Sequence, residues 1–165
     1  MIIINILLGG VEGGGMGSYS SSGSSDDYND DDASAIEHLI HRSLYIGKSK
    51  DISTVRDVHH STLTKFSDTP PYHMMEYEEA CLHEEMFFAN VSDYDYSIEG
   101  MRITMLDSNS SVALATFILE YRGMVVDDYS FTGQVIKGKV RCTIVCRKID
   151  GRWYIVHEHI SKTGT

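Results

Sequence analysis

The stretch DGRWYIVHEHIS, residues 150–161, holds the clearest structural signal in the chain. Its first two residues, Asp150-Gly151, are typical of a type I′ turn, because both central positions of that turn need a positive φ. Residues 134–149 before the turn and residues 152–161 after it are long enough, and rich enough in strand-forming side chains, to pair. The sequence therefore predicts a long β-hairpin near the C-terminus.

A period of two extends upstream of this hairpin. Tyr94, Tyr96 and Ile98 alternate with polar neighbours, and residues 101–105 continue the pattern. Residues 112–121 form a nearly continuous apolar run, which is typical of a strand covered on both faces. We therefore expect an antiparallel meander of strands from residue 94 onward.

Helical periodicity precedes the strands. Ser34-Ala35-Ile36-Glu37 has the spacing of a capping box and predicts a helix that begins there and stops at Gly47. Asp51 is expected to cap a shorter second helix, and residues 77–89 to form a third. Residues 62–66, between these two, alternate like a short strand. Helices followed by an antiparallel meander indicate the α+β class.

The composition indicates one domain with a tail. The chain has 165 residues, 42% of them hydrophobic, and a formal net charge of -10. Residues 1–32 are rich in Gly, Ser and Asp and are predicted to be a flexible leader, with an acidic interaction arm as the alternative; residues 33–165 form the domain. The negative charge argues against a nucleic-acid partner. No apolar run reaches the roughly 20 residues of a membrane-spanning helix, so no membrane partner is expected.

Cysteine and histidine spacing gives no cofactor or metal site. Cys81, Cys142 and Cys146 lack a CxxC pair and a zinc-like spacing, and we interpret them as reduced thiols of a cytoplasmic protein. His157 and His159 project to the same side of a strand, but a chelate needs a third ligand, and the alternative is hydrogen bonding across the sheet or a subunit interface. No metal and no cofactor are predicted. Four of the other histidines, His38, His41, His59 and His60, are expected on exposed helix surfaces.

Residues 150–161 resemble the closing hairpin of the nuclear transport factor two-like superfamily. The pattern is most similar to the SnoaL-like polyketide cyclase and ketosteroid isomerase-like branch, and to the association domain of calcium/calmodulin-dependent kinase, which ends in dG-[KR]-W-x-x-V-H-x-H-x-S. The likeness covers residues 33–162. It implies a cone-shaped, curved antiparallel sheet wrapped around about three N-terminal helices, with an internal pocket, and homodimers formed through the outer face of the sheet.

Strand alternation and this resemblance together assign the two faces of the sheet. By similarity to the association domain, the residue after the second His of H-x-H lies inside the cone, which also places Glu158 inside unless a bulge reverses the alternation. A carboxylate among aromatic rings would have its pKa raised by desolvation and would suit a general acid or base. The alternative is a solvated or ion-paired Glu. The catalytic Asp of the isomerase branch has no clear counterpart, and Asp68 is the nearest by location.

The expected site residues fall into two groups. Glu158 is the candidate catalytic residue. The candidate ligand-binding residues, which are expected to face the interior, are Phe66, Tyr94, Phe117, Tyr121, Tyr154 and Glu158. The candidate dimer-interface residues, which are expected to face outward, are Arg141, Trp153, His157 and His159.

Two functions are compatible with this sequence. The first is binding of a small apolar molecule, with proton transfer of the isomerase, cyclase or dehydratase type through Glu158. The second is a non-catalytic association module that uses the outer face of the sheet. An interior carboxylate in an apolar wall favours the first, and an outer face rich in His and Arg favours the second.

Overall fold

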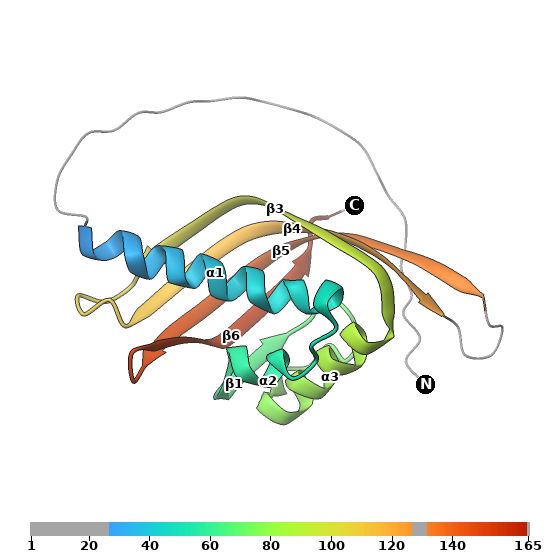
Figure 1. The fold of residues 1–165 in the computed structure, drawn as a ribbon, viewed down its shortest axis with the longest axis horizontal. Coiled ribbons are helices and arrows are strands. Elements are labelled where there is room, and N and C mark those ends of the chain that lie inside the picture. The colour runs from blue at the N-terminus through green and yellow to red at the C-terminus, as the bar shows by residue number, and fades with distance from the viewer. Residues whose placement is uncertain (1–26, 127–131, 165) are drawn as a thin grey trace.

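The computed structural model describes residues 27–126 and 132–164, and the predicted leader before residue 27 lies outside them. The described residues contain helices and strands in the order drawn in Figure 1. The helices are α1 (Asp27–Ser49), α2 (Thr54–Val58) and α3 (Tyr77–Asn90). The strands are β1 (His59–Phe66), β2 (Met75–Glu76), β3 (Val91–Met105), β4 (Val112–Val126), β5 (Gly133–Ile149) and β6 (Arg152–Lys162). The α+β prediction is confirmed.

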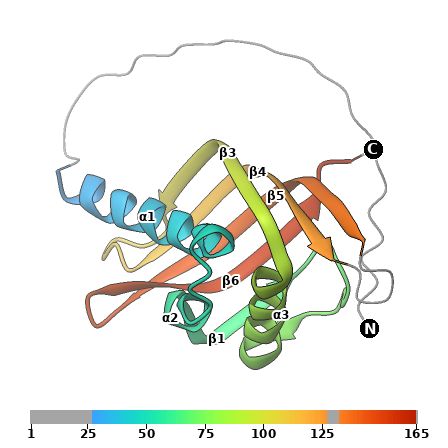
Figure 2. The same ribbon diagram turned by 45° about the vertical axis from the view of Figure 1, so that its right-hand side comes forward.

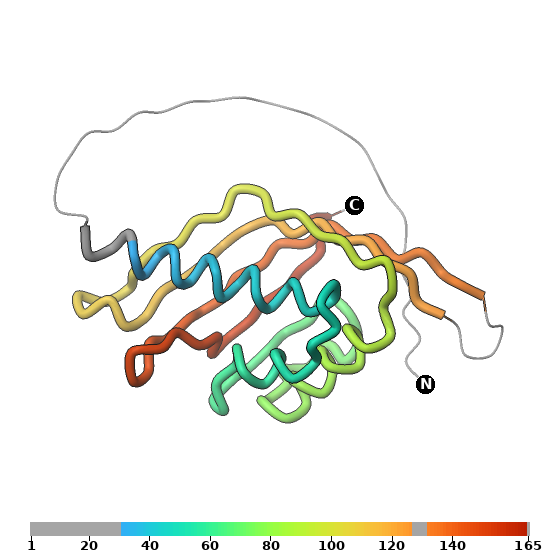
Figure 3. Tube along the Cα trace, in the orientation of Figure 1, coloured from blue at the N-terminus to red at the C-terminus, as the bar shows by residue number. Residues whose placement is uncertain are grey.

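The strands form one curved sheet in the order β2-β1-β6-β5-β4-β3. Strands β3 to β6 make the predicted antiparallel meander, whereas β1 joins the sheet parallel to β6. The predicted turn is confirmed, because Asp150 has φ 50° and Gly151 has φ 77°. Figure 2 shows α1 and α3 on the same side of the sheet, and Figure 3 shows β4 and β5 continuing beyond the other strands.

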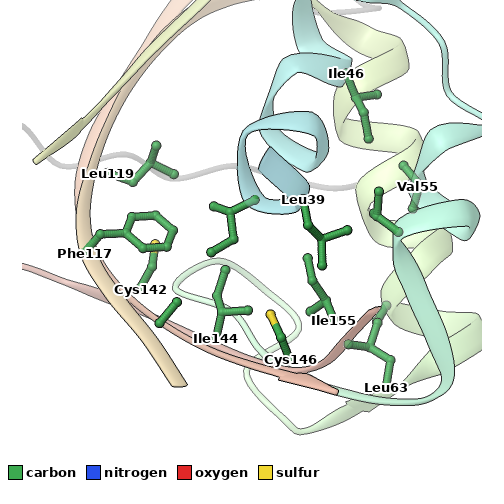
Figure 4. Packing of buried hydrophobic residues seen from close by; sticks show 14 of the residues in the cluster. Leu39, Ile46, Val55, Leu63, Phe117, Leu119, Cys142, Ile144, Cys146 and Ile155 are labelled. Carbon is green, nitrogen blue, oxygen red and sulfur yellow. The ribbon is translucent and has the colours of Figure 1, made fainter. Parts of the chain in front are cut away.

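The hydrophobic core fills the space between the helices and the inner face of the sheet. Alternate residues of β4 and β5 are buried there, including Phe117, Leu119 and Cys142. Leu39 of α1 and Val55 of α2 point toward the same region (Figure 4). Burial of alternate positions is what a sheet covered on one face requires. Among the described residues, no helix has the length and apolar content needed to cross a membrane.

Helix α1 is longer than predicted. It begins at Asp27, so Ser34 lies inside the helix and the capping-box prediction is wrong. Residues 27–32, assigned to the leader, are therefore helical. Asp32 explains part of this extension, because its Oδ1 accepts hydrogen bonds from Trp153 Nε1 at 2.9 Å and Lys148 Nζ at 2.7 Å. These bonds fasten the first half of α1 to the hairpin of β5 and β6.

The helix also passes through Gly47, where a stop was predicted, and ends at Ser49. Lys50, rather than the glycine, takes the left-handed conformation, with φ 61°. Gly47 is instead required by packing. A Cβ at Gly47 would lie 2.2 Å from Cδ1 of Tyr94, so only a glycine lets this ring lie against α1.

A β-bulge in β6 changes which side chains face inward. Val145 pairs with His157 and the next residue, Cys146, pairs with Ile155, so β6 has one extra residue between them. The bulge reverses the alternation expected from the sequence. Trp153 is consequently buried on the inner face, and its predicted outward orientation is wrong. The predicted inward orientation of Tyr154 is wrong for the same reason, whereas Glu158, beyond the bulge, is buried as expected.

Candidate functional site

Four ionisable side chains meet beneath the sheet, and we call them the buried tetrad. They are His59 and Lys65 of β1, Glu84 of α3 and Glu158 of β6. Their exposed fractions are 2%, 4%, 8% and 5% respectively. Charged side chains are almost never buried this fully unless they are paired, so the tetrad is the strongest candidate for a site among the described residues.

Local structure brings each member of the buried tetrad into place. The parallel register of β1 and β6 sets Lys65 opposite Glu158, with both side chains on the inner face. His59 begins β1 directly after α2, and its Nδ1 lies 2.7 Å from the carbonyl oxygen of Val55. This contact orients the ring so that Nε2 faces the carboxylates. Glu84 lies on the buried stripe of α3.

The cations and carboxylates of the buried tetrad alternate. Oε1 of Glu158 lies 3.3 Å from His59 Nε2, and its Oε2 lies 2.7 Å from Lys65 Nζ, although this second contact is not aligned as a hydrogen bond. Lys65 Nζ also donates a hydrogen bond to Oε1 of Glu84, which lies 3.9 Å from His59 Nε2. The nitrogen and oxygen atoms of His59, Glu84 and Glu158 are close enough together to surround a cation. Because Lys65 contacts both carboxylates, a metal ion would have to displace it.

Burial and pairing shift the pKa values of the two carboxyl groups in opposite directions. Burial opposes ionisation of Glu158, but Lys65 and His59 outweigh it and hold the pKa of Glu158 well below 4.5. Burial, together with repulsion from Glu158, raises the pKa of Glu84 above 4.5 despite Lys65 and His59. The prediction that desolvation raises the pKa of Glu158 is therefore wrong, because the sequence did not reveal the two cations beside it.

The same carboxylates keep both cations charged. Burial lowers the pKa of His59, but the charges of Glu84 and Glu158 outweigh it and bring the pKa well above 6.5. Burial also opposes the charge of Lys65, yet the attraction of Glu158 and Glu84 raises the pKa of Lys65 above 10.5. With both carboxylates ionised, the buried tetrad carries two positive and two negative charges.

An aromatic group of Phe87, Phe88, Tyr94 and Tyr121 lies beside the buried tetrad. The ring of Phe87 is 6.2 Å from that of Tyr94 and 6.4 Å from that of Tyr121, measured between centroids. Burial raises the pKa of Tyr121 to about 12, and burial with the nearby charge of Glu84 contributes to the raised pKa of Tyr94. Both phenols therefore remain protonated hydrogen-bond donors at neutral pH.

The structure places the candidate ligand-binding residues on both faces of the sheet. Tyr94, Phe117, Tyr121 and Glu158 face the interior. Phe66 does not, because it pairs with His159 on the outer face, where the two rings are 5.7 Å apart. Tyr154 likewise lies outside, with Arg152 over its ring at 4.9 Å and His60 at 5.7 Å. Phe66 and Tyr154 therefore do not line an interior site.

The outer face carries three of the four candidate interface residues. Arg141 donates to the carbonyl oxygen of Lys162 at 2.8 Å, and His157 Nδ1 lies 2.7 Å from the hydroxyl of Thr64. His159 is exposed, whereas Trp153 lies in the core. An open depression of about 480 Å³ also lies here. It is lined by Glu99, Gly100, Thr116, Phe117, Ile118, Arg141, Cys142 and Thr143.

Sequence reasoning missed His59, Lys65 and Glu84. His59 was expected on an exposed helix surface, but it is the buried first residue of β1. A signal was present for Glu84, because it falls on the buried stripe of α3 that also includes Phe88. Asp68, the nearest match to a catalytic Asp, lies outside the buried tetrad, and burial raises its pKa.

Comparisons with known proteins agree with this architecture. The model of the SnoaL-like domain family matches residues 36–164. An NTF2-like superfamily protein from Salmonella enterica is 19% identical, with a TM-score of 0.65 over 82% of this chain and 94% of that one. The association domain of C. elegans CaMKII is 18% identical, with a TM-score of 0.62 over 82% and 99%.

A ketosteroid isomerase-like protein from Erwinia carotovora is 17% identical, with a TM-score of 0.59 over 80% of this chain and 96% of that one. At these identities the solved structures establish the fold alone. They include proteins named for chemistry and for assembly, so the fold leaves the function to be argued from the site. No curated protein matches the chain.

Proposed function

The chain belongs to the SnoaL-like domain family, and from that premise we propose that it binds a small, largely apolar molecule on the helix side of its sheet and transfers a proton on it. The reaction would be of the isomerase, cyclase or dehydratase type. The observation that carries this proposal is the buried tetrad beside the aromatic group. It supplies carboxyl groups for proton transfer, and the rings supply apolar contacts for a ligand.

Energetics support a functional interpretation of the buried tetrad. Replacing a buried ion pair by apolar side chains of similar volume is often neutral or stabilising by about 1–4 kcal/mol. Four ionisable groups in a core therefore add little to the free energy of unfolding beyond what leucine side chains at the same positions would add. Two neighbouring carboxyl groups whose pKa values move apart are also a feature of acid–base pairs.

Binding of 2-naphthol, an apolar molecule with one acidic hydroxyl, tests this proposal. Calorimetric titration of the native protein is expected to show saturable binding. Phe87→Ala is expected to weaken binding by about tenfold or more, because Phe87 contacts both Tyr94 and Tyr121. Met86→Ala is the matched control, since Met86 is exposed on the same helix. An absence of saturable binding, or equal losses in the two variants, would contradict the proposal.

Self-association through the outer face is the second candidate function. It is supported by the open depression and by the polar and aromatic side chains around it, and one structural neighbour is named an association domain. Thr143→Arg would place a charge at the centre of this face, between Thr116 and His159. It is expected to weaken a homodimer at least tenfold in sedimentation equilibrium, whereas exposed His73→Arg should leave it unchanged. A monomeric native protein would exclude this function.

The proposal extends to a cytoplasmic location. Cys81, Cys142 and Cys146 are buried and unpaired, and free structural thiols are typical of reducing compartments. Thiol titration of freshly purified, denatured protein is expected to find all three cysteines reduced. A disulfide formed in the cell would contradict this location.

A further inference from the structure

The two carboxylates of the buried tetrad differ in which of their oxygens face the cations. Each oxygen of Glu158 faces a different cation, His59 for Oε1 and Lys65 for Oε2. The recorded contacts of Glu84 with these cations all use its Oε1. The side chain of Glu84 is also slightly more exposed, at 11% against 7% for Glu158. Glu84 is thus the more exposed of the two carboxylates, and its contacts with the cations are on one oxygen only.

Helix geometry sets Glu84 next to the aromatic group. Phe87 and Phe88 follow Glu84 by three and four positions on α3, so all three side chains share one side of the helix. The charge of Glu84 also acts on the hydroxyl of Tyr94. A ligand packed against these rings would therefore lie closer to Glu84 than to Glu158.

We propose that Glu84, rather than Glu158, is the catalytic acid–base residue of this site, and that Glu158 is a positioning residue that anchors Lys65 and His59. This inference rests on the proposed function. The ligand class is a neutral, mostly apolar molecule with an acidic C–H or O–H bond. The ionised Glu84 carboxylate takes that proton, its electron pair stays on the ligand as an enolate or a phenolate, and the protonated Glu84 later returns the proton to another ligand atom.

The charges of the buried tetrad suit this step. Before proton transfer its two cations and two carboxylates balance. After transfer Glu84 is neutral, so the tetrad carries one net positive charge opposite the single negative charge of the ligand. Lys65 and His59 would then stabilise the anion without moving. The opposite pKa shifts of the carboxyl groups agree with this division of roles.

Proton counting during 2-naphthol binding tests the inference. Isothermal titration calorimetry at pH 7 in two buffers of different ionisation enthalpy measures the protons released. In the native protein the naphthol proton moves to Glu84, so release close to zero is expected. Glu84→Gln imitates the protonated residue and has no acceptor, so it should release about one proton and bind the naphtholate more tightly. Glu79→Gln, an exposed change on the same helix, should match the native protein.

The outcomes separate the inference from the proposed function. If the native protein does not bind 2-naphthol, the proposed function fails. If it binds but Glu84→Gln releases no proton, or if Glu158→Gln or Asp68→Asn is the variant that releases one, the function stands and Glu84 is the wrong residue. If the Glu84→Gln variant does not fold, carboxyl ¹³C NMR of the native protein tests the inference without it. Addition of 2-naphthol should shift the Glu84 signal toward its protonated position and leave that of Glu158 unmoved, and the reverse would overturn the inference.

Discussion

Lys65 is the residue on which the buried tetrad depends, because its ammonium group contacts both carboxylates. Lys65→Met keeps the volume of the side chain but leaves two buried carboxylates with His59 as their remaining cation. Removing one partner of a buried pair costs about 3–5 kcal/mol, so we expect a loss of this size in the free energy of unfolding measured with urea. Adding Glu158→Gln to Lys65→Met removes one of the unpaired carboxylates, so the double variant should regain part of the lost free energy of unfolding. A loss below about 1 kcal/mol would mean that the pair is not formed.

His59 should make stability decrease at alkaline pH. Its folded-state pKa is raised above 6.5, so the folded protein binds this proton more tightly than the unfolded chain does. The resulting stabilisation is complete below pH 6.5 and is lost as the pH rises through the folded-state pKa. Within that window the slope approaches about 1.4 kcal/mol per pH unit. Urea unfolding from pH 6 to pH 9 should show this decrease in the native protein relative to His59→Gln, and parallel profiles would contradict it.

The sequence could predict one member of the buried tetrad but not its partners. Glu158 was expected to face inward, and it is buried. Lys65 and His59 could not be recognised as its partners, because β1 is separated from β6 by most of the domain and pairs with it in parallel. A local pattern of hydrophobicity indicates which face of a strand is buried, but it does not identify the distant strand with which that strand pairs. The pKa of Glu158 was mispredicted for that reason.

The elements themselves were predicted more reliably than the exact register within them. The turn at Asp150-Gly151 and the meander depend on local sequence, and both are confirmed. The sequence indicates that a bulge could reverse the alternation, but not that it lies near Val156. Its position depends on how β5 and β6 pair, and not on the local sequence of β6. That single residue decides that Trp153 lies in the core and Tyr154 outside.

The early start of α1 makes Asp32 a structural residue. Asp32 accepts hydrogen bonds from Trp153 and Lys148, and its pKa is lowered chiefly by the bond to Lys148. Asp32→Ala would leave the buried Trp153 Nε1 without this acceptor, which costs about 1–3 kcal/mol. Thermal unfolding should therefore occur at a lower temperature than in the native protein. Asp31→Ala is the control, because Asp31 is exposed on the same turn, and equal effects of the two changes would argue against the contact.

At the scale of the whole molecule, the sheet separates two surfaces with different chemistry. The inner face holds the core, the aromatic group and the buried tetrad under the helices. The outer face holds the open depression, with Arg141 and Thr143 among its lining residues. Away from bulges, side chains alternate between these faces along each strand, so a change on one face leaves the other largely intact. One domain of this fold therefore has room for both proposed functions.

This separation predicts that ligand binding and self-association are independent. At 2-naphthol concentrations about 100 times the Kd, binding should stabilise the native protein by about 2.7 kcal/mol and raise its Tm accordingly. Thr143→Arg should keep that ligand-dependent shift while losing the dimer, and Phe87→Ala should lose the shift while keeping the dimer. Differential scanning fluorimetry and sedimentation of the same four samples, native, each single variant and the double variant, measure both properties. If Thr143→Arg abolishes the ligand-dependent shift, the two faces are coupled through the sheet, and the interior site is complete only in the assembled protein.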